Sequence, residues 1–404
     1  MDSSSKRKLI RNDKKHMNKH LVLHWLWKNQ AATKASLASE FGVDKSTLVR
    51  IVKQLVDISL ITVADKTTST PLGGRKALMY DLDSNFGCVL GLEIQPTYYR
   101  SVLLDLKGNV IKRKSGGFDE FPSFEKLVFY VLKELSGEFV QKQTVLGISI
   151  GLPGWVDSTN QIIKYSVLHH LKNYDFFKNI SSKYDIPVIV ENDANCCAWG
   201  ELSINKSKKL SNFIHILGEF HHSTNRNRSD IGVGFGMILN GKVYYGSNFS
   251  AGDFKSVFWQ KGNRYQFGIP QKRMVNLPKD SKTLREVIKE LFSNLSVLIC
   301  TLNPSYIFIG GDLKNYKKTI ESVLADDLKS SYVVDSENQC TIAFSDLDEF
   351  GVAFGGAWRF LEGLFALPNP LKKHYKVELT WENTLAVLPK IEKQKKTNPL
   401  GFKL

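Results

Sequence analysis

Apolar residues near the start of the chain recur with the spacing of one helix face. Val22, Trp25 and Leu26 follow the i, i+3, i+4 pattern and predict a first helix. A second helix is expected to start after Thr33, whose hydroxyl suits an N-cap, and to end at Gly42. These segments predict a small helical module at the start of the chain.

A third helix follows, with either Asp44 or Ser46 as its cap. Its apolar face repeats at i, i+3, i+4 and i+7: Leu48, Ile51, Val52 and Leu55. Two short helices joined by a turn that contains glycine are typical of a helix-turn-helix, whose second helix enters the DNA major groove. The polar face of this helix carries side chains suited to base edges and phosphates: Lys45, Ser46, Thr47, Arg50 and Lys53.

A β-hairpin is predicted next. Residues 60–64 and 76–82 resemble strands, and the loop between them is rich in Thr, Ser, Pro and Gly. Gly74 and Arg75 at the end of that loop suit a wing that presents an arginine, a residue favoured in narrow, A·T-rich minor grooves. We therefore predict that residues 1–84 form a winged helix-turn-helix that binds double-stranded DNA. The alternatives are a small helical domain that binds protein and a charged surface without a partner.

From residue 85 the pattern changes to short strands interrupted by helices. The first set comprises strands at 89–93, 101–104, 110–112, 144–150 and 185–190, with a helix at 124–135. The second set comprises strands at 212–217, 231–239, 242–245, 306–309 and 340–344, with helices at 284–302 and 352–364. A meander followed by alternating strand and helix thus occurs twice, which predicts two α/β lobes with a cleft between them.

The chain is long enough for two or three domains, and its charge is concentrated at the two ends. Over the 404 residues, 55 Lys and Arg face 40 Asp and Glu, a formal net charge of +15. Residues 1–84 hold 15 basic and 8 acidic residues, residues 371–404 hold 8 and 3, and the long middle holds 32 and 29. Clustered positive charge indicates a polyanionic partner, which fits DNA binding by the N-terminal module and its basic arm. For the basic tail, 371–404, packing on the lobes, non-specific attraction to DNA and disorder all remain open.

The cysteines and the hydropathy narrow the class of protein further. The five cysteines are odd in number and contain no C-x-x-C pair, so they indicate neither a disulfide framework nor a zinc cluster. No apolar run reaches the roughly 18 residues of a membrane span, and no cleavable leader is evident. We expect a reduced, cytoplasmic protein.

Several motifs in a fixed order carry a resemblance. After the winged helix come GLPG at 151–154, ENDAN at 191–195, GVGFGMILNGKVYYG at 232–246 and NPSYIFIGGDL at 303–313. This order resembles the ROK family of repressors, open reading frames and sugar kinases. The resemblance implies an actin-like (ribonuclease-H-like) fold of two lobes, and members with an N-terminal winged helix are similar to the xylose and N-acetylglucosamine repressors of bacteria. We expect lobe I at 85–200 plus 346–370, lobe II at 201–345, and a C-terminal tail beyond.

The same resemblance suggests a ligand site. Asp193 matches the family's catalytic aspartate, Asn192 a sugar-binding asparagine and Asp253 a sugar-contacting glutamate. His169 or His170 lies where a sugar-facing asparagine is common, and we take His170 as the candidate. An Asn-Asp turn between strand and helix, and histidines on the surface, are the structural alternatives. The implied partners are an inverted-repeat operator, a sugar or sugar-phosphate effector and a second copy of the chain, as homodimer or tetramer.

The chain departs from the family's kinases where phosphate and metal bind. The first phosphate turn reads Glu93–Tyr98 without a glycine, and Asp230 replaces the first glycine of the second phosphate loop. None of the family's four zinc ligands is present, and Ser256 replaces the sugar-contacting histidine. We therefore expect no catalysis, no metal and no cofactor, with Asp193 a vestigial base position. An ATP-dependent sugar kinase with an accessory DNA-binding domain is the alternative function.

Overall fold

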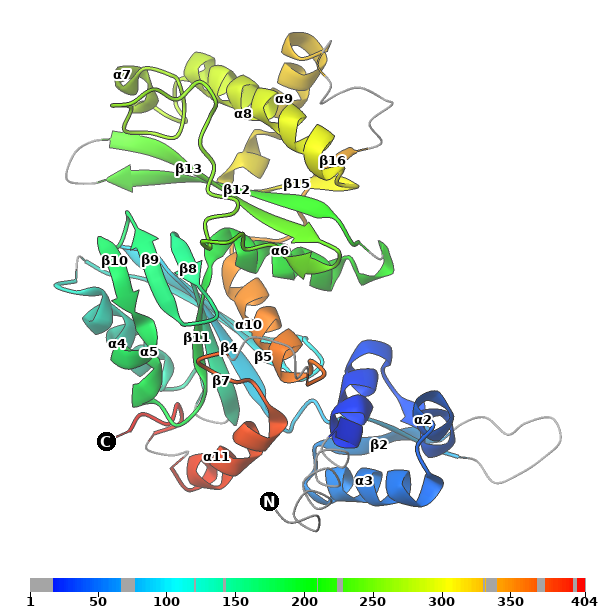
Figure 1. Ribbon diagram of the computed structural model, residues 1–404. Helices are drawn as coiled ribbons and strands as arrows, with labels where there is room; N and C mark the ends of the chain where they lie inside the picture. Colours follow the sequence, from blue (N-terminus) through cyan, green and yellow to red (C-terminus); the bar gives the residue numbers. More distant parts are fainter. Residues whose placement is uncertain are drawn as a thin grey trace, which may run out of the picture.

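The computed structural model describes ten stretches of the chain, and all structural statements below concern them: residues 17–66, 77–119, 121–140, 143–208, 210–223, 228–329, 331, 340–368, 375–394 and 398–403. Figure 1 shows two lobes stacked one above the other, with the N-terminal module beside the lower lobe. No helix within these stretches combines the length and the apolar character that a membrane crossing requires.

The N-terminal module, residues 17–82, has the predicted winged helix-turn-helix architecture. Its helices are residues 17–29, α2 (Lys34–Phe41) and α3 (Lys45–Asp57). Its antiparallel sheet has the order β1-β3-β2, formed by β1 (Ala32–Thr33), β2 (Ile61–Lys66) and β3 (Leu78–Leu82). The predicted hairpin is therefore present as β2 and β3.

Local capping explains where the helices of the module begin and end. Thr33 forms a capping box with Ser36, and Gly42 ends α2 in the left-handed conformation at φ 57°. Of the two caps left open by the sequence, Asp44 is the one observed, because its carboxylate accepts the backbone N–H groups of Ser46 and Thr47.

Lobe I is built on a five-stranded sheet of order β11-β7-β4-β5-β6. Its strands are β4 (Cys88–Ile94), β5 (Tyr98–Asp105), β6 (Val110–Gly117), β7 (Val145–Leu152) and β11 (Val188–Asn192). The first three form the predicted antiparallel meander, and β7 and β11 extend the sheet in parallel. Every residue of β4 and β7 is buried because α10 (Gly351–Leu364) covers one face and α4 (Phe124–Leu135) covers the other.

Lobe II is built on a second five-stranded sheet, of order β14-β13-β12-β15-β16. Its strands are β12 (Phe213–Ser223), β13 (Arg228–Leu239), β14 (Lys242–Val243), β15 (Tyr306–Gly311) and β16 (Thr341–Phe344). The long helix α8 (Ser281–Leu302) packs on this sheet, with α7 (Gln271–Met274) and α9 (Lys317–Ser322) nearby (Figure 1). The strands of both sheets are formed by the segments that were predicted as strands.

Helices α6 (Asp193–Ile204) and α10 cross between the two sheets (Figure 1). They approach closely because Gly355 has no side chain: a Cβ there would lie 1.7 Å from the carbonyl oxygen of Cys196. In the same way, a Cβ on Gly236 of β13 would lie 2.2 Å from the carbonyl oxygen of Ala194. The glycines of β13 that the sequence associates with a phosphate loop thus allow close packing of a strand on α6.

A third sheet, of order β10-β9-β8, was not predicted. It is formed by β8 (Trp155–Asp157), β9 (Ile162–Ser166) and β10 (Leu171–Asp175), followed by the short helix α5 (Phe176–Asn179). These strands are three to five residues long and only partly buried, so they carry little apolar periodicity for a sequence pattern to reveal.

The described part of the C-terminal tail packs on lobe I. Helix α11 (Trp381–Gln394) places Trp381 in the same hydrophobic cluster as Phe365, with ring centroids 5.2 Å apart. Further along, Phe402 forms a β-bridge with Tyr184. Of the three interpretations left open by the sequence, packing against a lobe is the one observed for residues 375–394 and 398–403.

Candidate functional site

The exposed face of α3 carries the candidate DNA-binding side chains. At about 100° per residue, Lys45, Ser46, Arg50 and Lys53 lie within an arc of about 140°, and the buried face of α3 lies opposite. Lys45, Ser46, Arg50 and Lys53 are exposed, and Thr47 is half-buried. Within the described part of the chain, no carboxylate forms an ion pair with any of the three cations. Their charge is therefore free to meet an external anion.

At the N-terminus of α3, one of the candidate DNA-binding residues, Ser46, takes part in the helix cap. The Ser46 hydroxyl donates a 2.7 Å hydrogen bond to the Asp44 carboxylate. This bond and the backbone N–H groups hold the pKa of Asp44 far below its usual range. Ser46 can still accept a hydrogen bond, whereas Lys45 and Arg50 remain free to donate. Gly74, Arg75 and the basic arm before residue 17 lie outside the described residues.

The second candidate site lies between the lobes, at the junction of β11 and α6. Asn192 caps α6: its Oδ1 accepts the backbone N–H of Asn195, and its Nδ2 donates to the Gly154 carbonyl and to Asp193 Oδ1, each at 2.9 Å. Asp193 Oδ1 also accepts the backbone N–H of Ala194 at 2.8 Å. The structure thus connects GLPG with ENDAN through the hydrogen bond from Asn192 to the Gly154 carbonyl.

The protonation of Asp193 is shifted by its surroundings. Burial is the largest cause, and the nearby Glu93 carboxylate adds to it, so that the pKa of Asp193 rises to about 7. A carboxyl with this pKa exchanges its proton near neutral pH, so it can donate a hydrogen bond to a ligand hydroxyl or accept one.

Asp253 and His170, the other two predicted ligand-binding residues, lie on other elements. Asp253 forms a β-bridge with Gly234 of β13; burial raises the pKa of Asp253, and the Trp155 side chain on β8 beside it lowers this pKa. His170 lies in the turn between β9 and β10 with a positive φ of 54°. Its neighbour His169 is mostly buried and binds the Ile94 carbonyl at 3.0 Å, and this burial lowers the pKa of His169 to about 4.

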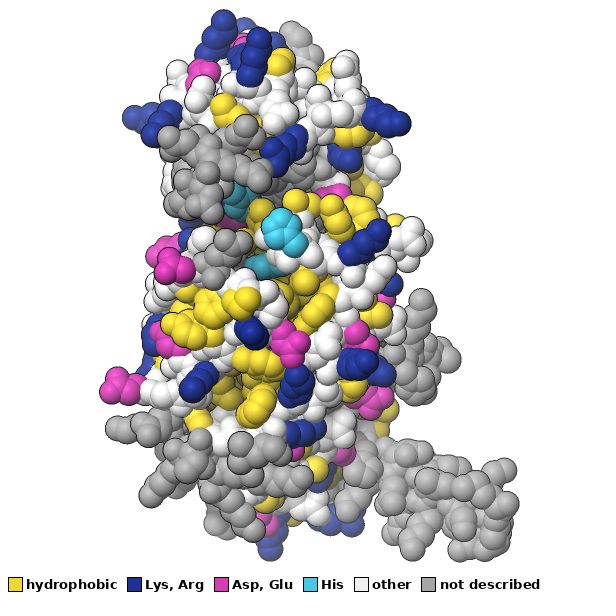
Figure 2. Space-filling model, turned by 90° about the vertical axis from the view of Figure 1, so that its left-hand side faces the viewer, with side chains coloured by type: hydrophobic (Ala, Val, Ile, Leu, Met, Phe, Trp, Pro, Cys, Tyr) yellow, Lys and Arg dark blue, Asp and Glu magenta, His cyan; other side chains and the backbone are white. Residues whose placement is uncertain are grey.

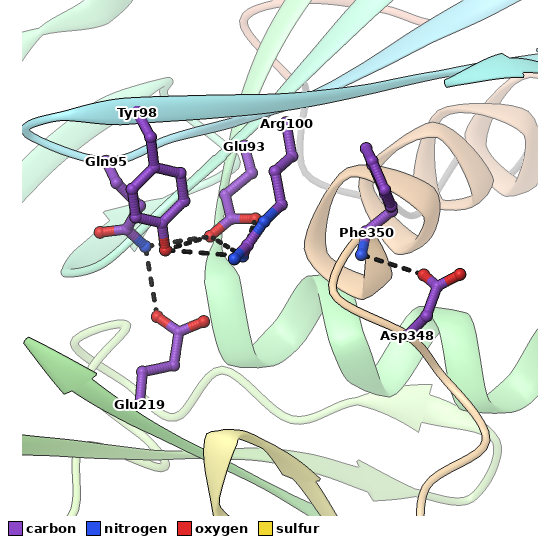
Figure 3. Close-up of polar contacts among 7 residues, drawn as sticks. All are labelled: Glu93, Gln95, Tyr98, Arg100, Glu219, Asp348 and Phe350. Carbon is purple, nitrogen blue, oxygen red and sulfur yellow. Dashed lines mark hydrogen bonds and ion pairs between the residues drawn. The ribbon is translucent and has the colours of Figure 1, made fainter. Parts of the chain in front are cut away.

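The turn between β4 and β5 is filled by a polar cluster that sequence reasoning missed (Figure 3). Glu93, fully buried, accepts hydrogen bonds from Gln95 at 3.1 Å and from Arg100, whose Nη1 lies 3.2 Å from Oε2. Tyr98 lies beside both, with its ring 4.6 Å beneath the Arg100 guanidinium. The signal available from the sequence was the hairpin register, because Glu93 and Arg100 are directly opposed in β4 and β5.

This cluster also connects the two lobes. Gln95 Nε2 lies 3.4 Å from the carboxylate of Glu219 on β12, which belongs to lobe II (Figure 3). Burial, followed by repulsion from Glu93 and Asp193, raises the pKa of Glu219. Gln95 therefore lies between the carboxyl groups of Glu93 in lobe I and Glu219 in lobe II, and Arg100 forms an ion pair with Glu93.

A second buried contact connects the site with α10. The Oε2 of Glu191 accepts a 2.8 Å hydrogen bond from the Tyr245 hydroxyl and lies 3.8 Å from Nε of Arg359. Glu191 Oε1 accepts the backbone N–H of Asn192. The Glu191 carboxylate at the end of β11 thus contacts Tyr245, which follows β14, and Arg359 of α10. It lies directly beside Asn192 and Asp193.

Residues 89–254 match the family model described as "ROK family", and residues 16–69 match the model described as "MarR family". The chain contains a ROK family domain. The predicted winged helix and the two-lobed fold are both confirmed.

Curated relatives of this chain include repressors. The xylose repressor of Bacillus subtilis (strain 168) is 26% identical over 246 residues, spanning 58% of this chain and 59% of the relative. The chain thus matches about three-fifths of the length of that relative. The xylose repressor of Lactiplantibacillus pentosus is 23% identical over 385 residues, spanning 87% of this chain and 94% of the relative.

Solved structures support the fold. A ROK family transcriptional regulator, described as a homologue of the Escherichia coli MLC protein, has a TM-score of 0.65 at 19% identity and covers 86% of this chain and 96% of its own. A ROK family glucokinase from Streptomyces griseus, in complex with glucose and AMPPNP, has a TM-score of 0.52 at 16% identity and covers 67% of this chain. The ROK fold therefore occurs in a regulator and in a kinase, so the fold alone does not distinguish these functions. The residues of the site provide the distinction.

Proposed function

We propose that this chain is a DNA-binding transcriptional repressor of carbohydrate-metabolism genes. The observation that carries the proposal is the exposed face of α3, where Lys45, Arg50 and Lys53 lie together without acidic partners among the described residues. Helix-turn-helix proteins present this face to the major groove, where arginine and lysine bind guanine edges and phosphates. The xylose repressor of Lactiplantibacillus pentosus, similar over nearly its whole length, supports the same function.

We propose the following division of labour. Residues 1–84 bind DNA, with Gly74 and Arg75 on the wing. Lobe I at 85–200 plus 346–370 and lobe II at 201–345 bind an effector and join two or four copies of the chain, with 371–404 as the tail. Because a dimer has two-fold symmetry, the operator is an inverted repeat.

The ROK domain acts as an effector domain without kinase activity in this proposal. Arg100 and Tyr98 fill the turn where a nucleotide phosphate would need free backbone N–H groups, and Pro96 supplies none. Glu93, Asp193 and Glu219 are carboxyl side chains, so they supply no positive charge for a polyphosphate. The Asp230 side chain, which the sequence places on the second phosphate loop, lies outside the described side chains. The effector is a sugar or sugar phosphate at Asn192, Asp193, Asp253 and His170.

One observation favours the alternative, a sugar kinase with an accessory DNA-binding domain. The pKa of about 7 at Asp193 suits a general base near neutral pH. A coupled assay with ATP and a panel of hexoses tests this alternative directly. We expect no turnover above a no-sugar control, and turnover that Asp193→Asn abolishes would establish the kinase instead.

Selection of bound duplexes from a random library tests DNA binding. We expect the full chain to enrich an inverted repeat. Two results contradict the proposal: no enriched motif at all, or enrichment that persists after Arg50 and Lys53 are both changed to alanine. Genomic fragments selected in the same way identify the regulated genes, and carbohydrate genes beside the operator are the expected result.

A further inference from the structure

An open cavity of about 730 Å³ lies at the outer end of the cleft between the lobes. Its floor belongs to β8, β9 and β10, and its opposite wall is Ser247–Phe249, in the segment after β14 of lobe II. Figure 2 shows hydrophobic side chains gathered with lysines and arginines among them on the face of the molecule that carries these strands. The volume lies within the range typical of small-molecule sites.

The floor carries three side chains in one row. Trp155 of β8 is directly opposite Tyr165 of β9, and Tyr165 is directly opposite Lys172 of β10. Opposed residues of antiparallel strands lie side by side, so Trp155, Tyr165 and Lys172 are neighbours across the three strands, with a β-bulge directly after Trp155. All three line the cavity, and Trp155 and Tyr165 are 37% and 44% exposed with ring centroids 5.8 Å apart. The two rings therefore offer one exposed apolar surface to a ligand in the cavity.

The charge of the cavity is positive. Asp157 is the single acidic residue of the lining; it is buried, accepts two hydrogen bonds from Asn160 and lies 3.6 Å from the ammonium of Lys164. Lys172 is exposed, and among the described residues no carboxylate lies within ion-pair distance of it. One unneutralised cation therefore stands at the end of the aromatic row.

The row adjoins the site between the lobes. Trp155 lies beside Asp253, and the carbonyl of Gly154, the preceding residue, accepts a hydrogen bond from the side-chain amide of Asn192. A ligand ring held at Asn192, Asp193 and Asp253 would thus have Trp155 at its edge, and a second ring would lie over Tyr165. Aromatic faces pack well against the apolar faces of sugar rings, and a phosphate would reach the ammonium of Lys172.

We propose that this outer cavity binds the second ring and the phosphate of a phosphorylated disaccharide, with Trp155 and Tyr165 as the platform and Lys172 as the phosphate-binding residue. This inference rests on the proposed effector function of the cleft and names the class of effector. The site is complete only when both lobes contribute, because Phe249 forms the wall opposite the row.

Isothermal titration of the full chain, without DNA, tests the proposal. The probes are a panel of disaccharides (cellobiose, gentiobiose, maltose and sucrose), their 6′-phosphates, glucose 6-phosphate and inorganic phosphate. We expect at least one disaccharide phosphate to bind about tenfold to hundredfold more tightly than its unphosphorylated form, the range of a charge-assisted hydrogen bond. We also expect it to bind more tightly than glucose 6-phosphate, which lacks the second ring.

Two variants locate the site. Lys172→Gln should remove the preference for the phosphorylated form, whereas the control Lys178→Gln, an exposed lysine on α5 outside the cavity, should keep it. Tyr165→Leu should weaken the phosphorylated and the neutral disaccharide alike. The proposal is wrong if no disaccharide phosphate is preferred, or if the preference persists in Lys172→Gln. Because these titrations contain no DNA, their failure leaves the duplex selection unaffected, and failure of the selection leaves the titrations unaffected.

Discussion

The indole of Trp27, in the N-terminal module, stacks on the phenyl ring of Phe365, just after α10 of lobe I. Their centroids are 5.1 Å apart and their planes are inclined by 6°. Trp358 of α10 lies on the same indole at 5.2 Å, and Lys28 forms an ion pair with Glu362 beside it. One hydrophobic cluster therefore runs without a break from the winged helix into lobe I.

Changing Trp27 to alanine should uncouple the module from the lobe. Deleting a buried tryptophan costs about 3–5 kcal/mol, and here most of that loss falls on the contact between the two parts. We expect calorimetry to show the module unfolding at a lower temperature than the lobes, as a separate transition. Trp259→Ala, in lobe II, is the control and should not split the transition in this way. A single unshifted transition in Trp27→Ala would contradict a shared core.

Two cations of α3 should contribute to DNA binding in different ways. Arg50→Ala should cost about 1–3 kcal/mol of affinity for the selected operator if the guanidinium binds a base edge. Lys53→Ala should instead lower the salt dependence of binding by about one phosphate contact on all sequences. Titration of labelled duplexes at several salt concentrations measures both effects. Lys126→Ala, an exposed lysine on α4, is the control, and parent-like binding by both α3 variants would rule out this docking face.

The raised pKa of Asp193 should make the protein less stable as the pH rises. An unfolded chain loses this proton near pH 4, whereas the folded protein keeps it to about pH 7. The free energy of unfolding should therefore fall between about pH 4 and 7, by on the order of 4 kcal/mol for this group. Urea unfolding across this range measures the slope. Asp193→Asn should flatten it, and an unchanged slope in that variant would show that Asp193 is not the group responsible.

The ion pair between Arg100 and Glu93 should matter far more than the one between Arg113 and Asp348. Glu93 is fully buried, so Arg100→Ala leaves a buried carboxylate without its cation and should cost about 3–5 kcal/mol. Arg113 and Asp348 are both exposed, so Arg113→Ala should cost about 0–1 kcal/mol. Urea unfolding measures both variants. The double variant Glu93→Gln, Arg100→Gln should recover part of the loss, because it removes the buried charge; equal costs for the two single variants would refute the argument.

Tyr245 should transmit the state of the ligand site to α10. Its hydroxyl binds Glu191, which is adjacent to Asn192 and faces Arg359, the residue next to Trp358. Tyr245→Phe should reduce the effect of the effector on operator affinity by about 0.5–2 kcal/mol, a typical size for such coupling. Operator titrations with and without effector measure the difference. Tyr244→Phe, an exposed neighbour, should leave the effect unchanged, and an identical response in both variants would exclude this connection.

Several elements could be predicted from the sequence because their signals are local. Helix α4 begins and ends at the predicted residues, since Ser123 caps it and its apolar face repeats regularly. Thr33 and Gly42 delimit α2 as expected, and the strands predicted at 231–239 and 242–245 pair as β13 and β14. Family motifs then identified the two lobes and placed Asn192 beside Asp193.

Other features depended on contacts between distant residues. The first helix was predicted from the apolar stripe formed by Val22, Trp25 and Leu26. Leu23 and Trp27, on another side of this helix, are also buried because α10 and α11 cover that side. The β8–β10 sheet was not predicted because its strands are short and partly exposed. The outer cavity was not predicted either, because this sheet forms its floor. Arg100 became a partner of Glu93 only through the register of β4 and β5.

The sequence by itself determined the helices of the winged module, the succession of strands and helices in the two lobes, and the concentration of positive charge at the two ends. Helix capping, apolar periodicity and local charge are properties of residues close together in the chain, so they can be recognised without knowing the fold. Only the tertiary structure decided that the tail packs on lobe I, that Trp27 joins the DNA-binding module to α10, and that Trp155, Tyr165 and Lys172 form one row. These features require segments far apart in the chain to meet, which local sequence patterns do not encode.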